Sequence, residues 1–448
     1  MITENKTITA ITISLGAFLT PFSIASLNVA LPSISRDLSM NTISMSLTLI
    51  SFLLTASIFL LPFGNIGDNH SRKTVFISGI GIFIIASFMS AVSQTATILI
   101  IARALCGAGS AMILSNGMPV LIESFPVNER GKILGIYSAF IYVGLALGAI
   151  AGGFLTQLLS WRWIFFIMLP IGLSVLILSF KLPQPNRRLK RSKFDIVGFV
   201  LYAMSLFLII YGFTTIDKSK NIIYIVIGFL LLLVFIAKQL RSKFPLIDVR
   251  IFLTNRTFAL SSLSVLTLYI STFSFPFILS LYLQFIRGLN VQTTGLILVI
   301  QPIFMSIIAP VAGKLSDKVQ PRIVASSGIL FIIVGFLLLA YLQRWPFIIP
   351  ILVLSLMGMG FGLFSSPNAN AVMSCVDKSI YGVASATLST MRTIGQTMSM
   401  ALVALIFSAN IRYSNAKVSM HDIAIIFSIS IAITFISLLF SLLRGKIR

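Results

Sequence analysis

Two arginines, Arg103 and Arg392, lie inside long apolar runs of the sequence, about seven and about ten residues from the start of their runs. A charged side chain at such depth in a membrane is costly unless it faces a helix-bundle interior or a wet cavity. There it can hold an anionic group or adjust a nearby proton site. The alternative for Arg103 is a packing role, with helix-end carbonyls accepting its hydrogen bonds.

Polar side chains accompany both arginines. Ser385, Ser389, Gln396 and Ser399 share one helical face with Arg392, because they recur at intervals of three or four residues. Such a stripe predicts cavity lining, although Ser and Gln also join neighbouring membrane helices by hydrogen bonds. The predicted substrate cavity comprises Ser23, Asn28, Arg103, Asn116, Gln284, Asn368, Asn370, Arg392 and Gln396.

Motifs of catalytic and cofactor sites are absent from the sequence. It lacks His-Glu-x-x-His, Cys-x-x-Cys and the phosphate loop G-x-x-x-x-G-K-[ST]. His70 and His421 are far apart in the sequence, and Cys106 and Cys375 fall in different environments. We therefore expect no catalytic residue, no metal site, no cofactor and no ATP-driven pump.

The composition predicts an all-α integral membrane protein. Of 448 residues, 57% are hydrophobic and 10% are charged, with a mean hydropathy of +1.03. Soluble domains are about 25% charged, so an ordinary soluble enzyme is excluded. A spanning helix needs about 20 apolar residues. Fourteen segments qualify: 8–32, 45–63, 74–93, 97–122, 132–158, 162–182, 196–215, 221–239, 258–285, 292–312, 323–342, 346–367, 382–408 and 421–443.

The basic excess follows the predicted loops. The chain has 33 Lys and Arg against 11 Asp and Glu, for a net charge of +22. With fourteen spans, 23 of the basic residues fall on the side of both termini and 8 on the other, with 2 inside spans. Positive loops face the cytoplasm. We expect cytoplasmic termini in a plasma or inner membrane, contact with the lipid bilayer, and no nucleic-acid partner.

A repeat divides the chain into two halves. Gly-x-[Ile/Leu]-x-Asp occurs at 64–68 and again at 313–317, at an offset of 249, in the predicted loops after the second and tenth spans. Gly131 and Gly144 recur as Gly382 and Gly395 at an offset of 251. Repeated halves around a central site are a common transporter plan. We predict six-helix bundles at 8–182 and 258–443, with two inserted helices in a linker at 183–257.

Five motifs resemble those of the major facilitator superfamily, in its fourteen-span drug:proton antiporter branch. They are the loop motif at 64–73, the arginine motif of the fourth span at 103–109, the glycine motif of the fifth span at 144–153, Asn-Val-Ala-Leu-Pro at 28–32, and Trp-Arg-Trp-Ile-Phe-Phe at 161–166. The resemblance covers nearly the whole chain. This sequence departs from the pattern at Asn69, Ser71, Cys106 and Ala149.

The resemblance implies roles for two groups of residues. In the loop motif, Asp68 would lie against the start of the thirteenth span and Arg72 would pair with Glu123, forming a gate latch. The gate group comprises Gly64, Asp68, Arg72, Lys73 and Glu123, with Gly313 and Asp317 in the second copy. Small residues allow close helix packing, and this role is expected for Gly144, Gly148, Gly152 and Gly153.

Ser23 is the departure that matters for mechanism. The antiporter branch usually carries an aspartate there, five residues before Asn28, and none of the eleven acidic residues falls in mid-membrane. A membrane-embedded carboxylate is the usual proton relay and the usual counter-ion for a cationic drug. We therefore expect weak or absent proton coupling.

The expected function is that of a secondary transporter that exports multiple drugs or lipophilic small molecules by alternating access. The alternative is a uniporter or exchanger of an anionic or neutral metabolite or a lipid. A channel or a non-transporting sensor fits the repeat less well. The expected partners are a small-molecule substrate, with protons as a candidate co-substrate, and the chain is expected to act as a monomer.

Overall fold

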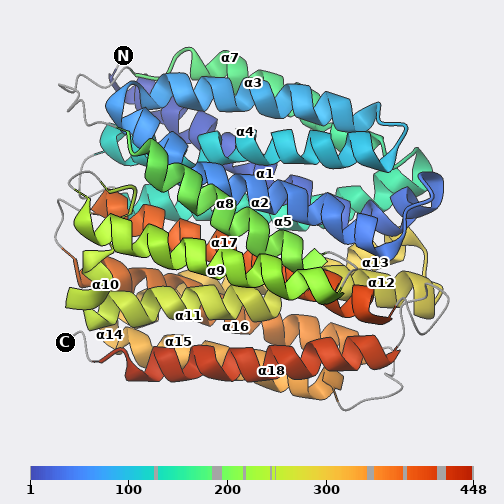
Figure 1. Cartoon of the computed structure of the whole chain (residues 1–448). Coiled ribbons are helices and arrows are strands. Elements are labelled where there is room, and N and C mark those ends of the chain that lie inside the picture. The colour runs from blue at the N-terminus through green and yellow to red at the C-terminus, as the bar shows by residue number, and fades with distance from the viewer. Residues whose placement is uncertain are drawn as a thin grey trace. The chain divides into compact units, whose positions relative to one another are not determined.

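The computed structural model describes residues 2–125, 130–183, 194–214, 218–242, 245–247, 249–340, 348–376, 381–410 and 420–445 (Figure 1). The helices are α1 (Ile2–Asp37), α2 (Thr42–Asn69), α3 (Arg72–Ala91), α4 (Ala96–Ser124), α5 (Arg130–Leu158), α6 (Trp163–Phe166), α7 (Met168–Ser179), α8 (Ile196–Thr214), α9 (Lys218–Arg241), α10 (Arg250–Thr254), α11 (Arg256–Thr272), α12 (Phe275–Leu281), the π-helix η2 (Tyr282–Ile286), α13 (Val291–Leu298), α14 (Ile300–Lys318), α15 (Pro321–Ala340), α16 (Ile348–Ser374), α17 (Tyr381–Asn410) and α18 (Met420–Leu443).

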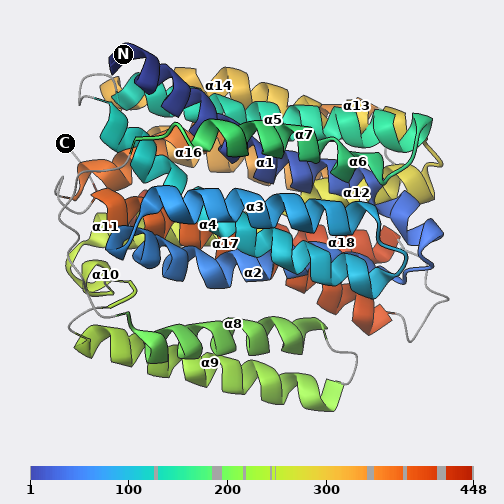
Figure 2. The ribbon, with the colours of Figure 1, turned by 90° about the horizontal axis from the view of Figure 1, so that it is seen from above.

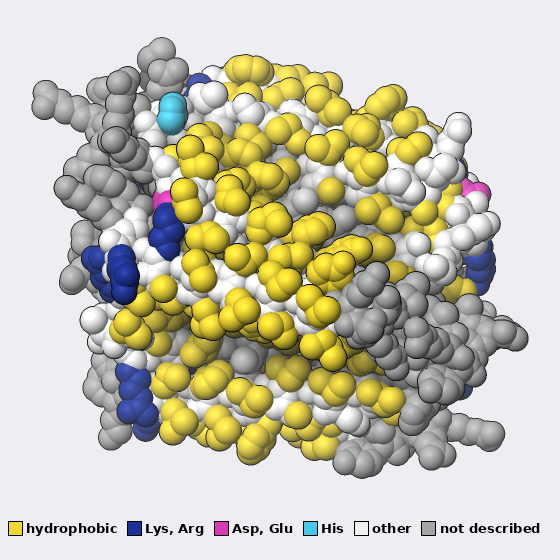
Figure 3. Space-filling view, viewed as in Figure 1, with side chains coloured by type: hydrophobic (Ala, Val, Ile, Leu, Met, Phe, Trp, Pro, Cys, Tyr) yellow, Lys and Arg dark blue, Asp and Glu magenta, His cyan; other side chains and the backbone are white. Residues whose placement is uncertain are grey.

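The fourteen predicted spans are confirmed. Among the described residues, thirteen helices are long and apolar enough to cross a membrane, and the shorter apolar stretch Trp163–Ser179 occupies the place of the sixth span. Helices are the expected solution, because each backbone polar group must find its partner inside the segment when lipid surrounds it. On the face shown in Figure 3, hydrophobic side chains cover the middle of the helices and Lys and Arg lie near their ends.

The first compact unit comprises Met1–Gly212 and Asp217–Leu246. Within it α5 packs along α1, and α4 packs against both α2 and α3. The inserted helices α8 and α9 lie side by side (Figure 2) and belong to this unit. Tyr202 joins them to the bundle, because its ring packs on Phe235 of α9 and its hydroxyl donates to the Ser57 carbonyl of α2 at 3.0 Å.

The second compact unit comprises Phe213–Ile216 and Ile247–Arg448. Here α16 packs on α14 and α15, while α11 packs on α17 and α18. Buried hydroxyl pairs tie α18 to its neighbours. These pairs are Ser264 with Ser437, Thr434 with Ser271, and Ser326 with Ser441, at 2.8–3.0 Å between oxygens.

Glycine contacts show that the two units repeat one packing plan. A Cβ on Gly107 of α4 would lie 2.1 Å from the Phe52 carbonyl oxygen of α2, and one on Gly358 of α16 would lie 2.5 Å from that of Gln301 in α14. The members of the second pair follow their counterparts by 251 and 249 residues. The predicted fold of two six-helix repeats with an inserted helix pair is confirmed, whereas the domain bounds 8–182, 183–257 and 258–443 stay predictions.

The repeated Gly-x-x-x-Asp motifs are helical, which corrects the prediction that they form loops. Gly64 and Asp68 lie in the last turns of α2, and Gly313 and Asp317 lie in the last turns of α14. No proline interrupts these turns, so each helix continues past its apolar segment. Ser71 then caps α3 by accepting a hydrogen bond from the Thr74 amide at 3.2 Å.

Candidate functional site

Arg103 and Arg444 are the largest fully buried side chains in the described part of the chain, and Arg103 is the one inside a membrane span. It projects from α4 toward α1, where its Nη1 donates to Ser23 Oγ at 2.8 Å. Both residues are 0% exposed. The structure thus brings together two of the predicted cavity residues, and Ser23 occupies the place from which a carboxylate would have paired with the arginine.

Aromatic rings complete the surroundings of the guanidinium. Its Cζ lies 4.4 Å from the centre of the Phe52 ring and 6.0 Å from that of Phe165. These cation–π contacts offset part of the cost of burial. Nε and Nη2 have no hydrogen-bond acceptor within the described structure. Arg103 therefore makes one neutral hydrogen bond and keeps one edge of its guanidinium unused.

The described carboxylates lie away from Arg103 and have cationic partners of their own. Glu123 lies at the end of α4, where its Oε1 accepts from Arg72 Nη1 at 2.8 Å. Asp37 ends α1 and Asp195 precedes α8. No described carboxylate is placed to neutralise Arg103.

The Arg72–Glu123 pair forms between the predicted gate residues. Next to it, Lys73 Nζ donates to the carbonyls of Phe180 and Leu182 at 2.7 and 2.6 Å, so it binds the end of the segment that contains α7. The side chains of Asp68 and Asp317 fall outside the described ones, and the latch between Asp68 and the thirteenth span stays a prediction. Gly64 and Gly313 face equivalent serines, Ser115 and Ser366.

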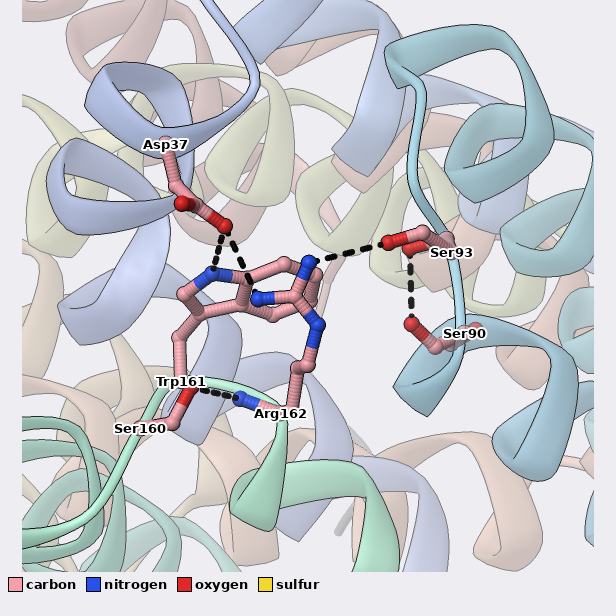
Figure 4. Close-up of polar contacts among 6 residues, drawn as sticks. All are labelled: Asp37, Ser90, Ser93, Ser160, Trp161 and Arg162. Atoms are coloured by element: carbon pink, nitrogen blue, oxygen red, sulfur yellow. Dashed lines mark hydrogen bonds and ion pairs between the residues drawn. The ribbon is translucent and has the colours of Figure 1, made fainter.

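A polar cluster at the far end of α1 was missed by sequence reasoning (Figure 4). Asp37 Oδ2 accepts from Trp161 Nε1 at 2.9 Å and from Arg162 Nη1 at 2.8 Å, while Arg162 Nη2 reaches the Ser93 carbonyl at 3.2 Å. The cluster joins the ends of α1, α3 and the segment before α6. The adjacent Trp161 and Arg162 were the only signal, since their partner Asp37 is more than 120 residues earlier.

A second missed cluster holds the inserted helices. Asp195 caps α8 through the Gly198 amide at 2.9 Å, and it also accepts from Lys238 and Gln239 of α9. Burial raises the pKa of Asp195, but the hydrogen bonds from Lys238, Gly198 and Gln239 outweigh burial and hold that pKa below its ordinary value. This carboxylate is a fixed anion that positions α8 against α9.

The predicted cavity amides of the first unit have packing partners. Asn116 Nδ2 donates to the carbonyls of Phe63 and Met112, both at 3.1 Å, and its Oδ1 would lie 1.7 Å from a Cβ on Gly67. Asn116 therefore joins α4 to α2 beside Gly67, where a larger residue would displace the Asn116 amide. Asn28 is buried within α1.

Arg392 is exposed, unlike Arg103, and its Cζ lies 5.3 Å from the centre of the Tyr269 ring of α11. Gln396 is half-buried, and Ser399, one turn further on, is buried and donates to Ser274 Oγ at 3.0 Å. The predicted polar stripe thus runs from an exposed to a buried end, with Ser385 outside the described side chains. Its cavity-lining role stays a prediction.

The amides after Pro367 take part in helix-end contacts. Asn368 Oδ1 accepts from Arg444 Nη1 at 2.6 Å, and Asn370 Nδ2 donates to Ser316 Oγ at 3.0 Å. The first contact joins α16 to the end of α18 and the second joins it to α14. Helix α16 continues through Pro367 to Ser374, so both amides lie on a continuous helix.

Gln284 lies on the π-helix η2, buried, with its Nε2 donating to Ser280 Oγ at 3.0 Å. Single π-helical turns are frequent at functional sites. Sequence patterns do not reveal such a turn, because it differs from an α-helix only in hydrogen-bond register.

The glycines of α5 form a ladder against α1. Built Cβ atoms on Gly144, Gly148 and Gly152 would lie 2.8, 2.6 and 2.6 Å from the carbonyl oxygens of residues 18, 22 and 26. This backbone contact accounts for the four-residue spacing, since one helical turn separates successive contacts. Gly153 is buried beside them.

Comparisons with known proteins agree on a family. The sequence profile of the Major Facilitator Superfamily matches residues 13–400. The chain is 28% identical over 424 residues to the riboflavin transporter RibZ of Clostridioides difficile, covering 94% of this chain and 92% of that protein. It is 24% identical to the multidrug resistance protein Stp of Mycobacterium tuberculosis, covering 91% of this chain and 76% of Stp.

The fold also matches a solved structure. A bacterial homologue of the human lysosomal transporter Spinster, in an inward-facing and unoccupied conformation, aligns with a TM-score of 0.69 over 98% of this chain and 97% of that chain. The identity is 13%, so this likeness concerns the fold alone.

Proposed function

The chain belongs to the Major Facilitator Superfamily of membrane transporters, and we propose that it is a secondary transporter that exports lipophilic small molecules by alternating access. The two repeated units support this mechanism, because transporters of this kind move one repeat against the other around a central site. The chain is a multi-pass membrane protein and not an enzyme. We place it in the plasma or inner membrane with cytoplasmic termini, on the basis of the positive loops.

The observation that carries the proposal is the Arg103–Ser23 pair. A buried cation with a hydroxyl partner suits cargo that is neutral or anionic, whereas a cationic drug would need a counter-charge in the membrane. Among relatives, RibZ is a riboflavin transporter and Stp a multidrug resistance protein, so both a defined metabolite and a range of drugs fit the family. Uniport or exchange of an anionic or neutral metabolite is the second candidate, favoured by Arg103.

The proposal also implies weak proton coupling. Proton antiport needs a group that titrates in the working range and is reached from both sides, a role that buried carboxylates fill because burial raises their pKa. Ser23 does not titrate and an arginine stays protonated.

The function is tested by flux in proteoliposomes. We expect the purified chain to move the neutral dye N-phenyl-1-naphthylamine faster than protein-free liposomes do, with little change when a pH gradient is imposed. A matched variant, Gly148→Leu, would force a side chain against the Phe22 carbonyl and should abolish the flux by disrupting the packing of α5 on α1 within the first unit. Flux no faster than through empty liposomes would contradict the proposal.

A further inference from the structure

The guanidinium of Arg103 has hydrogen-bond donors without an acceptor along one of its edges, called the open edge below. Nη1 donates to Ser23 Oγ at 2.8 Å, whereas Nε and Nη2 lack an acceptor among the described residues. Nε–H and one Nη2–H point in parallel from the same side of the planar group. Two oxygens of one oxyanion match that pair of donors, which is the bidentate geometry preferred by arginine and carboxylate.

The hydroxyl of Ser23 leaves the charge of Arg103 uncompensated. A hydroxyl accepts a hydrogen bond but carries no charge, and both residues are 0% exposed. Removing the counter-charge of a buried ion is costly, and an anion that arrives at such a site recovers part of that cost. Asp37, Glu123 and Asp195, the described carboxylates of this unit, are bound to Arg162, Arg72 and Lys238.

The aromatic rings beside Arg103 indicate which kind of cargo molecule would bear the anionic group. Phe52 lies against the guanidinium face at 4.4 Å, and Phe165 lies at 6.0 Å, both measured from Cζ to the ring centre. These two aromatic rings make part of the surroundings of the guanidinium apolar. An oxyanion attached to an aromatic or otherwise lipophilic body matches both parts of these surroundings.

We infer that Arg103 and Ser23 form a charge-selecting subsite, in which the open guanidinium edge binds an oxyanion of a lipophilic cargo and Ser23 keeps that edge available. This inference rests on the proposed transport function. Since both residues are fully buried here, the oxyanion reaches the edge only when the side chains around it move aside. An aspartate at position 23 would occupy the arginine and reverse the charge preference.

Binding is measured by thermal unfolding of the purified protein in detergent, with benzoate, its neutral counterpart benzamide, and chloride as probes. We expect benzoate to raise the melting temperature and benzamide to leave it unchanged. Ser23→Asp should weaken the benzoate effect at least about tenfold, because it removes charge-assisted hydrogen bonds worth roughly 1.5 kcal/mol or more. Ser35→Asp, an acid added elsewhere on α1, should retain the effect.

Three outcomes would overturn the inference. Benzamide could stabilise as well as benzoate, or Ser23→Asp could respond like the unmodified protein. Chloride could match benzoate at equal concentration, in which case an inorganic ion and not a planar oxyanion of the cargo fits the edge. Because Ser23→Asp supplies a counter-charge to Arg103, we expect it to fold, and its melting temperature without ligand checks this.

A flux measurement with two dyes tests this inference separately from the proposed transport function on which it rests. The dyes 1-anilinonaphthalene-8-sulfonate and N-phenyl-1-naphthylamine differ only in the sulfonate. We expect Ser23→Asp to lower the ratio of anionic to neutral flux about tenfold. An unchanged ratio with neutral flux intact would refute charge selection and leave transport standing. If neither dye crosses, the proposed export of such molecules fails, and the benzoate measurement still decides the subsite.

Discussion

The two units share a backbone plan but differ at the position of Arg103. A Cβ on Gly144 would meet the Phe18 carbonyl of α1, and one on Gly395 would meet the Leu266 carbonyl of α11, which gives an offset of 248 residues for α1. With this offset and the offset of 251 for α4, Ser271 is the equivalent of Ser23 and Leu354 is the equivalent of Arg103. Leu354 is fully buried, and Ser271 Oγ accepts from Thr434 Oγ1 at 2.8 Å. The second unit therefore closes this position with a leucine and a hydroxyl pair, whereas the first unit keeps a cation with an open edge.

Arg444 is a second buried arginine, located at the end of a helix, and can be compared with Arg103. It follows the last residue of α18, and its Nη1 donates to Asn368 Oδ1 at 2.6 Å, with Ser261 Oγ at 3.4 Å. Burial, together with the neighbouring Arg322, lowers the pKa of Arg444 to about 10. Arg444 thus serves as a tie between α18, α16 and α11 outside the membrane-spanning segments. Its Nε and Nη2 also lack an acceptor among the described residues, so Arg103 differs from it by lying inside a span and by having a serine hydroxyl as its partner.

The shared backbone plan predicts the largest effects on stability. Gly107→Ala places a Cβ 2.1 Å from the Phe52 carbonyl, and Gly358→Ala places one 2.5 Å from the Gln301 carbonyl. Each change should cost about 1–3 kcal/mol through overpacking. Thermal unfolding in detergent measures this, with Gly81→Ala as the control, because a Cβ there meets nothing within 4 Å. A Gly107→Ala protein as stable as the Gly81→Ala protein would break the equivalence of the two units.

Much of this architecture is visible in the sequence. Uninterrupted apolar runs locate the spans, and the offset of 249–251 residues between Gly64, Gly144 and their copies reveals the repeat. The pairing of Arg72 with Glu123 follows from the motif resemblance. These features depend on local composition or on short sequence patterns, so they can be predicted without the tertiary structure.

The features that the sequence does not predict depend on contacts between segments far apart in the chain. Asp37 meets Trp161 and Arg162 only because the ends of α1 and α5 are brought together, and Asp195 meets Lys238 only once α8 and α9 pair. The open edge of Arg103 likewise depends on the tertiary structure, because it exists only when Ser23 accepts from Nη1 and not from Nε or Nη2. Apolar patterning also ends at the membrane boundary, so it places the helical Gly64 and Asp68 in a loop.

A smaller effect is expected where the inserted helices join the first unit. The folded-state pKa of Asp195 is lowered, so its stabilisation is present above its ordinary pKa near 4 and is lost as pH falls through the folded-state value. Asp195→Asn should therefore lower the stability of the protein at pH 7 by about 1 kcal/mol and reduce its loss of stability below pH 4. Melting temperatures from pH 7 to pH 3 measure both effects. Equal acid sensitivity in the two proteins would remove Asp195 as a titrating tie.

The central claim, that the first unit carries a cation without a titrating partner, is tested by efflux of the monovalent cationic dye ethidium from proteoliposomes under an imposed pH gradient. The unmodified protein should show little efflux driven by the gradient, and Ser23→Asp should increase it, because it adds a titratable carboxylate beside Arg103. Ser35→Asp should leave the efflux unchanged. Strong, protonophore-sensitive efflux of ethidium by the unmodified protein would contradict the account, and the proton path would then have to run through a carboxylate nearer the membrane edge.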